Sequence, residues 1–309
     1  MSLFGLDIGG TKCAVIKANE DNRPNTVKRF ATSDVNTALQ MLFNAIVDLG
    51  IESEPIFGVS CGGPLDTKKG LILSPPNLPG WDEIPIVDLL EERFGGKAYL
   101  MNDADASAIA EWKFGAGRGS ESMVFLTFGT GMGAGLILDG RLYTGSLGLA
   151  GEVGHIRMAE TGPKGHNKYG SFEGFCSGGG IAQLAQERAR KLQGKVSFNP
   201  GTIDQITTKD VGEAAARGDD IAQEILALSG SYLGMGLAIL IDLLNPEAIV
   251  LGSIYGRCQQ FLEPTMRQVL SEEALPMSLA ACRILPAALG EEIGNYAAIS
   301  AALYSTGRF

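Results

Sequence analysis

The sequence predicts a mixed α/β protein built from two lobes. Strand-like apolar runs alternate with amphipathic helical runs along the whole chain, as they do in α/β folds. The length of 309 residues suits about two domains of ~100–200 residues each. In each half, a glycine-rich turn joins two strand-like runs, at Gly9-Gly10 and at 129–134. Antiparallel hairpins are therefore expected within both lobes.

The first half begins with a predicted hairpin, formed by the apolar runs at 3–7 and 13–16. Apolar residues at helical spacing predict a helix over 36–49. The loop at 75–81 is rich in proline and can be neither a helix nor a central strand. The other elements expected in this half are strands at 55–60, 70–74 and 98–101 and helices at 86–94 and 104–114.

A glycine-rich, charged stretch at 115–122 is the expected boundary between the lobes. Residues 1–115 would form the N-terminal lobe and 116–294 the C-terminal lobe, and a final helix within 295–309 could rejoin the N-terminal lobe. The elements expected after the boundary are strands at 123–127, 135–138, 141–143, 248–251 and 283–285 and helices at 181–192, 210–217, 220–244, 260–271 and 295–304.

Composition excludes several classes of protein. The formal net charge is -10, whereas a general nucleic-acid binder needs a basic surface to neutralise phosphates. The apolar run at 233–251 is interrupted by Asp242 and Glu247, so it predicts a buried helix and strand, not a membrane span. No signal-peptide pattern is visible, and the five cysteines are scattered without CxxC spacing. We therefore expect a cytoplasmic protein with no nucleic-acid or membrane partner.

The first glycine turn is a candidate phosphate-binding loop. The backbone N–H groups of Gly9 and Gly10, the hydroxyl of Thr11 and the ammonium of Lys12 could all face a phosphate. Asp7, at the end of the preceding strand, could hold Mg²⁺ directly or through water. An ordinary tight hairpin with a solvated lysine explains this stretch equally well.

The second glycine turn matches a dinucleotide fingerprint only superficially. The residues from Gly129 through Thr130 and Gly131 to Ala134 fit G-x-G-x-x-G/A. That fingerprint requires a helix next, and here a strand, an Asp139-Gly140 turn and another strand follow. A second hairpin-type phosphate loop is the better interpretation.

An Asn-Asp pair marks the candidate catalytic position. Asn102 and Asp103 stand at the end of a predicted strand and before a helix, where ligands collect in open α/β sheets. The same pair could simply cap that helix. Asp105 offers a second acid, for which the simpler interpretation is a first-turn partner of the helix dipole.

Other polar and glycine residues are candidate ligand contacts. Gly63 lies in a Gly-Gly-Pro turn that lets backbone approach a ligand, although a plain turn is the alternative. Asn77 could touch a polar ligand or only form its turn. Glu152 and His155 suit hydroxyl recognition, with a structural histidine as the alternative, and Glu173 could be solvated or face a ligand.

Two further glycine-containing stretches are candidate ligand contacts. Gly252-Ser253 follows a buried strand and could approach an adenosine. Gly178-Gly179-Gly180 opens a predicted helix, whose N-terminus is a candidate anion site.

Five motifs in order along the chain resemble those of the ROK sugar kinases, a family of the actin-like ATPase superfamily. They are DIGGTK at 7–12, NDADASA at 102–108, FGTGMGAG at 128–135, GEVGH at 151–155 and NPEAIVLGS at 245–253. The resemblance implies a two-lobed actin-like ATPase (ribonuclease H-like) fold with ATP and a sugar bound in the cleft. It also implies an ATP-dependent hexose kinase, with a glucose-like substrate phosphorylated at its 6-hydroxyl, and a homodimer.

The resemblance further implies roles for individual residues. Asp103 would be the general base. Contacts to the sugar would come from Gly63, Asn77, Asn102, Glu152, His155 and Glu173. Contacts to ATP would come from Asp7, Gly9, Gly10, Thr11, Lys12, Gly129, Thr130, Gly131, Gly252 and Ser253, with Asp7 near Mg²⁺.

Two other functions compete with the kinase. A non-catalytic sugar-sensing regulator of the same fold is the first, and the presence of Asp103, Asp7 and Lys12 argues against it. An NAD-linked oxidoreductase is the second, and the strand after Gly135 disfavours it.

The sequence departs from the family pattern at two points. Many members follow their Gly-His with a Cys-x-Cys-Gly-x-x-Gly-Cys zinc cluster, whereas 156–176 contains only Cys176, so we predict no structural zinc. Family repressors carry an N-terminal helix-turn-helix, for which the phosphate loop beginning at residue 7 leaves no room in this sequence.

Overall fold

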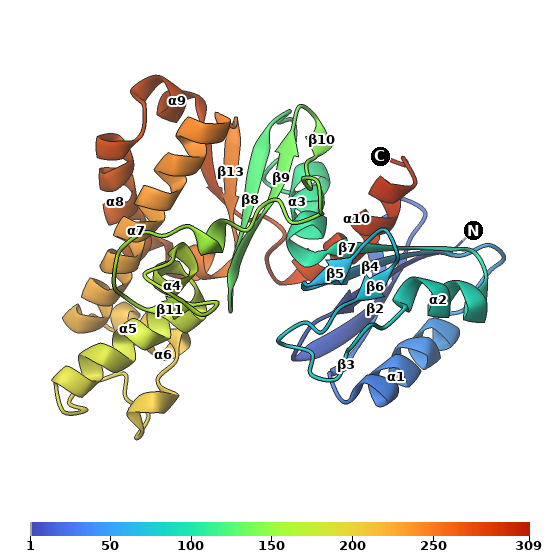
Figure 1. Ribbon diagram of the computed structural model, residues 1–309, viewed down its shortest axis with the longest axis horizontal. Coiled ribbons are helices and arrows are strands. Elements are labelled where there is room, and N and C mark those ends of the chain that lie inside the picture. Colours follow the sequence, from blue (N-terminus) through green and yellow to red (C-terminus); the bar gives the residue numbers. More distant parts are fainter. Residues whose placement is uncertain (1) are drawn as a thin grey trace.

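A computed structural model describes residues 2–309, which form two lobes that each contain a five-stranded sheet (Figure 1). The first sheet has the order β3-β2-β1-β4-β7 and the second has the order β10-β9-β8-β13-β14. In both sheets an antiparallel hairpin is followed by two parallel strands, because β1 pairs with β4 and β8 pairs with β13 in parallel. Both hairpins expected from the glycine turns are confirmed.

The strands of the first sheet are β1 (Leu3–Ile8), β2 (Lys12–Ala18), β3 (Pro24–Ala31), β4 (Ile56–Cys61) and β7 (Lys97–Asn102). Those of the second are β8 (Met123–Phe128), β9 (Met132–Leu138), β10 (Arg141–Leu142), β13 (Ala248–Leu251) and β14 (Arg283–Pro286). Two small hairpins are formed by β5 (Leu65–Asp66) with β6 (Leu71–Ile72) and by β11 (Lys164–Gly165) with β12 (Lys168–Tyr169).

Helices cover both faces of the first sheet. On one face, α1 (Val35–Asp48) and α2 (Ile86–Phe94) bury apolar side chains against those of β1 and β4. On the other face lies α10 (Ile293–Ser305), which packs directly on the sheet. It comes this close because Gly5 and Gly58 have no side chain: a Cβ at Gly58 would lie 2.2 Å from the Ala298 carbonyl oxygen.

The lobes meet along α3 (Asp103–Phe114) and α10. These two helices pack on each other, and α3 also packs on β9 of the second sheet. Gly135 of β9 permits that contact, because a Cβ there would lie 2.5 Å from both the Ala104 carbonyl oxygen and the Ala108 Cβ. The first turn of α3 is therefore in contact with elements of both lobes.

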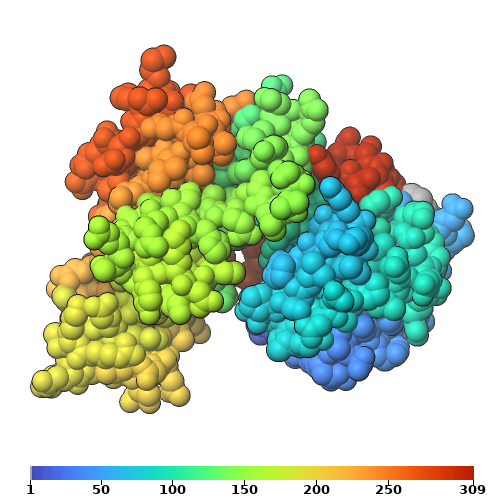
Figure 2. All heavy atoms as spheres, viewed as in Figure 1, coloured from blue at the N-terminus to red at the C-terminus, as the bar shows by residue number. Residues whose placement is uncertain are grey.

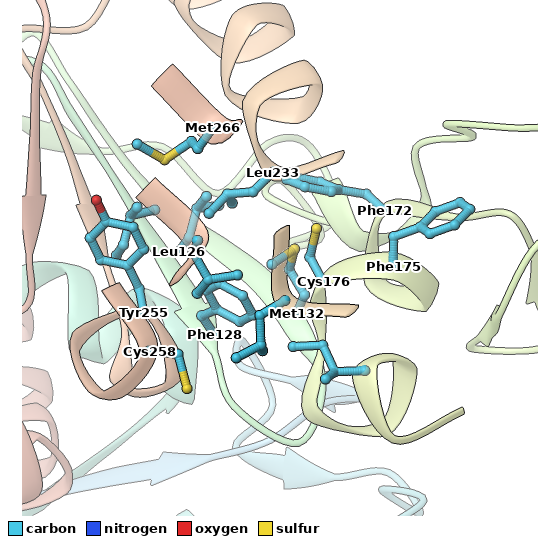
Figure 3. Close-up of a cluster of buried hydrophobic side chains, with 14 of the residues drawn as sticks. Leu126, Phe128, Met132, Phe172, Phe175, Cys176, Leu233, Tyr255, Cys258 and Met266 are labelled. Carbon is cyan, nitrogen blue, oxygen red and sulfur yellow. The ribbon is translucent and has the colours of Figure 1, made fainter. Parts of the chain in front are cut away.

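The second lobe has the larger apolar core. Figure 3 shows Leu126, Phe128 and Met132 of the β8–β9 hairpin meeting side chains of α4, α7 and α8. By length and composition α7 could cross a membrane, with a mean hydropathy of 1.7, but 61% of its apolar window is buried in the structure, as in a core helix. The helices here are α4 (Phe172–Cys176), α5 (Gly178–Lys191), α6 (Thr208–Ala216), α7 (Asp220–Leu244), α8 (Ser253–Glu273) and α9 (Pro276–Ala281), with single 3₁₀ turns at Val153–His155, Ile203–Gln205 and Gly290–Glu292.

Several elements differ from the sequence prediction. The strand expected at 70–74 is only the two-residue β6, and the helix expected at 260–271 begins at Ser253 instead. That early start was missed because Gly252 and Gly256 in the sequence indicate a turn. In the structure the helix has a local kink at Cys258, with φ -118°. The edge strand β3 and the short helices α4 and α9 were not predicted; β3 is largely polar and half-exposed, so it has no clear apolar alternation.

Candidate active site

Figure 2 shows a hollow between the two lobes, and the first glycine hairpin joins β1 to β2 in the first of them. Its turn is closed by a hydrogen bond of 3.1 Å from the Gly9 N–H to the Lys12 carbonyl oxygen. The tip is exposed, and a Cβ at Gly10 would lie 2.5 Å from the Asn77 carbonyl oxygen. The loop that carries Asn77 therefore packs against the hairpin.

Asp7 is the last but one residue of β1, beside this hairpin, and its side chain meets the start of α10. A Cβ at Gly294 would lie 2.4 Å from Asp7 Oδ2. Burial, followed by the negative charge of Asp103, raises the pKa of Asp7 to about 6, while the charges of Lys12 and Arg29 act in the opposite direction. Asp7 and Asp103 thus share one electrostatic environment.

Such a site suits a divalent cation. Mg²⁺ is commonly held by one or two carboxylates together with water and phosphate oxygens. A cation beside Asp7 would relieve the repulsion from Asp103 that this geometry creates. The residues present therefore fit Mg²⁺, and the role of Asp7 as its ligand, directly or through water, stays a prediction.

Asn102 confirms the helix-cap interpretation, and the role of Asn102 and Asp103 toward a ligand stays a prediction. Asn102 caps α3, because its Oδ1 accepts hydrogen bonds from the N–H groups of Ala104 (2.9 Å) and Asp105 (3.4 Å). Its Nδ2 lies 3.6 Å from where a Cβ would stand at Gly63, so the amide nitrogen faces the Gly-Gly-Pro turn.

The Asp103 carboxylate faces the same turn. One oxygen accepts from the Ala104 N–H at 2.9 Å, and the other lies 3.7 Å from the position of a Cβ at Gly62. The side chain is accessible to water, yet protein surrounds it closely enough for burial to raise the pKa of Asp103, with a further contribution from Glu152.

Glu152 lies opposite the first turn of α3. Its charge raises the pKa of both Asp103 and Asp105. The preceding Gly151 is fixed to β9, because its carbonyl oxygen accepts from the Ala134 N–H at 2.7 Å and its φ of +92° favours glycine. A β-strand of the second lobe therefore holds Glu152 at the cleft.

His155 is exposed at the end of the same segment. Its ring centroid is 4.8 Å from that of His166, and its carbonyl oxygen accepts a hydrogen bond from Lys168 Nζ. Among residues 2–309, no three His, Cys, Asp or Glu side chains are grouped so that they could hold a metal ion. The expected absence of zinc stays a prediction.

The segment after His155 is ordered by hydrogen bonds. The Phe172 N–H donates to the Ile156 carbonyl oxygen, and the Met158 N–H to that of Gly170, both at 2.8 Å. Gln183 of α5 both accepts from and donates to the backbone of Lys164, at 2.9 and 2.8 Å. These contacts join the segment to α4 and α5.

Glu173 lies at the second glycine hairpin. Its Oε2 accepts from the Met132 N–H at 3.0 Å and is equally close to where a Cβ would stand at Gly131. The structure therefore ties one carboxylate oxygen of the expected sugar ligand Glu173 to the expected phosphate loop. The role of Glu173 toward a sugar stays a prediction.

The remaining expected ATP contacts gather around the same hairpin. The Gly129 carbonyl oxygen accepts from the Gly178 N–H at the start of α5, at 2.8 Å. Ser253 Oγ donates to the Phe128 carbonyl oxygen at 3.3 Å. A Cβ at Gly252 would lie 3.0 Å from the Phe128 nitrogen. The segments Phe128-Gly129 and Gly252-Ser253, which are more than a hundred residues apart in the chain, thus form one surface next to Thr130.

Sequence reasoning missed two residues of this site. Arg29 of β3 acts on the charge of Asp7 and lies 3.5 Å from a carboxylate oxygen of Glu292. Gly294 supports the Asp7 carboxylate. Neither belongs to a local motif, and β3 itself was not predicted.

Comparisons with known proteins agree with this geometry. A family model described as the ROK family matches residues 3–303. The glucokinase of Thermotoga maritima is 29% identical over 309 residues, 97% of this chain and 96% of that protein. A crystal structure of a ROK family glucokinase from Streptomyces griseus, in complex with glucose and AMPPNP, has a TM-score of 0.77 and 29% identity over 98% of both chains. That of the ROK hexokinase from Thermus thermophilus has a TM-score of 0.80 and 28% identity over all of both chains. The expected two-lobed actin-like fold is confirmed.

Regulators are also among the relatives. The DNA-binding transcriptional repressor Mlc of Escherichia coli is 31% identical over 221 residues, which are 71% of this chain and 53% of the repressor. A ROK family transcriptional regulator shares the fold with a TM-score of 0.84 at 22% identity, covering 98% of this chain and 78% of the regulator. Overall similarity alone does not separate a kinase from a sugar-responsive regulator. The residues of the cleft must therefore be used to distinguish the two functions.

Proposed function

This chain belongs to the ROK family, and from that premise we propose that it is an ATP-dependent sugar kinase. One observation carries the proposal: Asp103 and Asp7 lie close enough for the charge of Asp103 to raise the pKa of Asp7. A general base for a hydroxyl and a ligand for Mg²⁺ must be neighbours in phosphoryl transfer, because the metal neutralises the phosphate that the hydroxyl attacks.

Asp103 is the proposed general base. Its carboxylate accepts the proton of the sugar hydroxyl as that oxygen attacks the γ-phosphorus of ATP. Burial raises its pKa, which makes the carboxylate a stronger base near neutral pH than an ordinary aspartate. The distance of 3.7 Å between Asp103 Oδ2 and the position of a Cβ at Gly62 supports a site in which the sugar lies beside the Gly-Gly-Pro turn.

The two glycine hairpins are the proposed phosphate contacts. Backbone N–H groups at Gly9, Gly10, Gly129 and Gly131 can neutralise phosphate charge without bulky side chains in the way. Thr11, Lys12 and Thr130 add a hydroxyl, an ammonium and a second hydroxyl, and Gly252-Ser253 would meet the adenosine. Mg²⁺ near Asp7 supplies the remaining positive charge when it is bound.

The proposed substrate is a glucose-like hexose, phosphorylated at its 6-hydroxyl. The relatives named glucokinase and the Streptomyces griseus complex with glucose support this choice. Asn102 uses Oδ1 as the helix cap, so its Nδ2 is the group available to a sugar hydroxyl. Gly63 and Asn77 would line the sugar, and Glu152, His155 and the second oxygen of Glu173 would accept its other hydroxyls.

The alternative is a sugar-sensing regulator without catalysis, which the similarity to Mlc favours. A regulator needs the sugar contacts but not Asp103, Asp7 and Lys12 in their catalytic arrangement. Sugar binding without turnover would therefore identify a regulator.

The test is a coupled assay of ADP release over a panel of hexoses, with wild type beside Asp103→Asn. We expect a glucose-like sugar to stimulate ADP release and the variant to lose about 10²–10⁴-fold in kcat. Asp88→Asn is the matched control, since Asp88 is also an aspartate in the first turn of a helix but lies outside the cleft. If no sugar stimulates ADP release, or if Asp103→Asn is as active as wild type, the kinase assignment fails.

Three broader properties belong to the same proposal. The chain would act in the cytoplasm. It would form a homodimer, so light scattering after size exclusion should give about twice 32.5 kDa. The units that close on the substrates would be residues 1–115 with 295–309 and residues 116–294, because α10 packs on β1 and β4 of the first sheet.

A further inference from the structure

Helix α3 carries two buried acids, Glu111 and Asp105, whose carboxylates differ in the hydrogen-bond donors around them. Glu111 is fully buried, and its carboxylate accepts hydrogen bonds from the backbone N–H groups of Ala116, Ala288 and Leu289. Asp105 is only 5% exposed, and among residues 2–309 its carboxylate oxygens lack a protein donor but keep a little contact with solvent. A carboxylate with so little access to water is costly as an anion, so Asp105 calls for a separate explanation.

The position of Asp105 is fixed by packing around the first turn of α3. Ala104 lies against Gly135 of β9, and the neighbouring Ala134 of the same strand binds the Gly151 carbonyl oxygen. The loop that begins at Gly151 therefore lies beside the strand on which this turn rests. Glu152 is brought toward Asp105 in this way, and Asp103 lies two residues before Asp105 on the helix.

Among residues 2–309, the ion pairs involve none of these three acids. The elements packed against α3 are β4, β7, β8, β9 and α10. Lys97 is the single basic residue on them, and it lies at the opposite end of β7, roughly 16 Å from Asn102 at ~3.3 Å per residue, where it pairs with Glu91. The other titratable groups on these elements are the thiol of Cys61 and the phenols of Tyr99, Tyr296 and Tyr304.

We propose that Asp105 is a positioning residue of the acceptor site that works only as a neutral carboxylic acid. In that form it leaves Asp103 and Glu152 as the two charges that face the sugar. Ionised Asp105 adds a third negative charge, which repels Glu152, disturbs the ionisation of Asp103 and opposes the approach of the phosphate. The inference rests on the proposed kinase function.

The protonation state agrees with this role. Burial, followed by the charges of Asp103 and Glu152, raises the pKa of Asp105 to about 7. Asp105 is therefore neutral below about pH 7 and ionises above it. Activity should fall on the alkaline side for this reason, separately from the fall on the acid side as Asp103 is protonated.

The simpler interpretation, a partner of the helix dipole, has a matched control. Asp88 occupies the third position of α2, as Asp105 does in α3, but it is exposed. If Asp105 acts only on the dipole, Asp88→Asn and Asp105→Asn should behave alike.

The experiment measures kcat/KM for the sugar from pH 5.5 to pH 9 for wild type, Asp105→Asn and Asp88→Asn. Wild type and Asp88→Asn should lose about tenfold for each pH unit above the alkaline pKa. Asp105→Asn should keep its activity to at least one pH unit higher. Asp105→Ser, a second neutral variant, should do the same. An alkaline limb that is unchanged in both Asp105 variants overturns the proposal.

Thermal unfolding without ligands provides an activity-independent readout. The raised pKa means that folding keeps Asp105 protonated where the unfolded chain ionises, so wild type loses stability as pH rises from about 4 to about 7. Asp105→Asn should therefore match wild type near pH 4.5 and exceed its Tm at pH 8, whereas Asp88→Asn should not. Equal Tm values for wild type and Asp105→Asn at both pH values contradict a buried neutral Asp105. If wild type is inactive but this Tm difference is found, the kinase proposal fails and the neutral state of Asp105 does not.

Discussion

At Gly294 a hydrogen atom stands where any other residue would carry a side chain, and that absence lets the Asp7 carboxylate lie over the start of α10. A methyl group there would come within 2.4 Å of Oδ2 and 3.1 Å of Cγ. Because Asp7 is a short side chain at the end of a strand, it cannot retract without turning away from the phosphate hairpin. The contact joins residues at opposite ends of the chain, so no local sequence pattern could have predicted it.

Gly294→Ala should therefore weaken the use of MgATP. We expect KM for MgATP to rise about tenfold or more, because a catalytic ligand displaced by about 1 Å is costly, while KM for the sugar stays within about twofold. The free energy of unfolding need not fall, since alanine in a helix is more favourable than glycine by about 1 kcal/mol. Steady-state kinetics with each substrate varied in turn measures both constants. A normal KM for MgATP in a folded variant would show that Asp7 is not held by this contact.

At the scale of elements, the short helix α4 connects the two proposed substrate sites. Ser171 caps it with a hydrogen bond of 3.1 Å from the Gly174 N–H, and the cap sets the following Glu173 beside Met132. One carboxylate oxygen holds the second glycine hairpin, and the other is proposed for the sugar.

Glu173→Ala should therefore raise KM for both substrates, whereas Glu152→Ala should raise only that for the sugar. Glu173→Gln keeps an acceptor for the Met132 N–H and should recover most of the MgATP affinity. In Glu173→Ala the Met132 N–H also loses its acceptor, which lowers the free energy of unfolding by about 1–3 kcal/mol if water does not reach that group. Initial-rate kinetics and thermal unfolding on the same samples separate these effects. A Glu173→Ala variant altered only toward the sugar would contradict the role in holding the loop.

Some elements and site residues could be predicted from the sequence, and others could not. The two hairpins could be predicted because glycine turns flanked by apolar runs have few alternatives, and α2 matches its predicted bounds of 86–94. Asn102 and Asp103 could be predicted as a site because a strand end before a helix is a recognisable place. Asp105 could not, since its burial depends on β9 and on the loop after Gly151, which are distant in sequence. The start of α8 and the strand β3 were missed because their local patterns are weak.

For the whole molecule, the acids of the cleft set the pH at which the ligand-free protein is most stable. The pKa of Asp7 is raised to about 6 and that of Asp105 to about 7, so both cost stability as pH rises from about 4 through those values. Other acids bind backbone or side-chain donors, and their lowered pKa values mean that stability is lost as pH falls below about 4; they include Asp34, Asp210 and Glu263.

The apo protein should therefore have its highest Tm near pH 5 and a lower Tm at pH 8. Thermal unfolding in matched ionic strength from pH 4 to pH 9 tests this, with Asp7→Asn and Asp105→Asn each expected to flatten the alkaline side. A Tm that rises steadily from pH 5 to pH 8 would contradict the burial of these two acids.

The proposed reaction transfers the γ-phosphoryl group of ATP to a sugar hydroxyl, with Asp103 as the base. The most direct measurement is phosphorus NMR of a mixture of ATP, Mg²⁺, glucose and the protein, with Asp103→Asn in parallel. Wild type should convert ATP and glucose to ADP and the phosphomonoester of a primary hydroxyl, and the variant should form this ester at least about 10²-fold more slowly. A wild-type mixture in which ATP is consumed only to inorganic phosphate, or a variant that forms the ester at the wild-type rate, would contradict it.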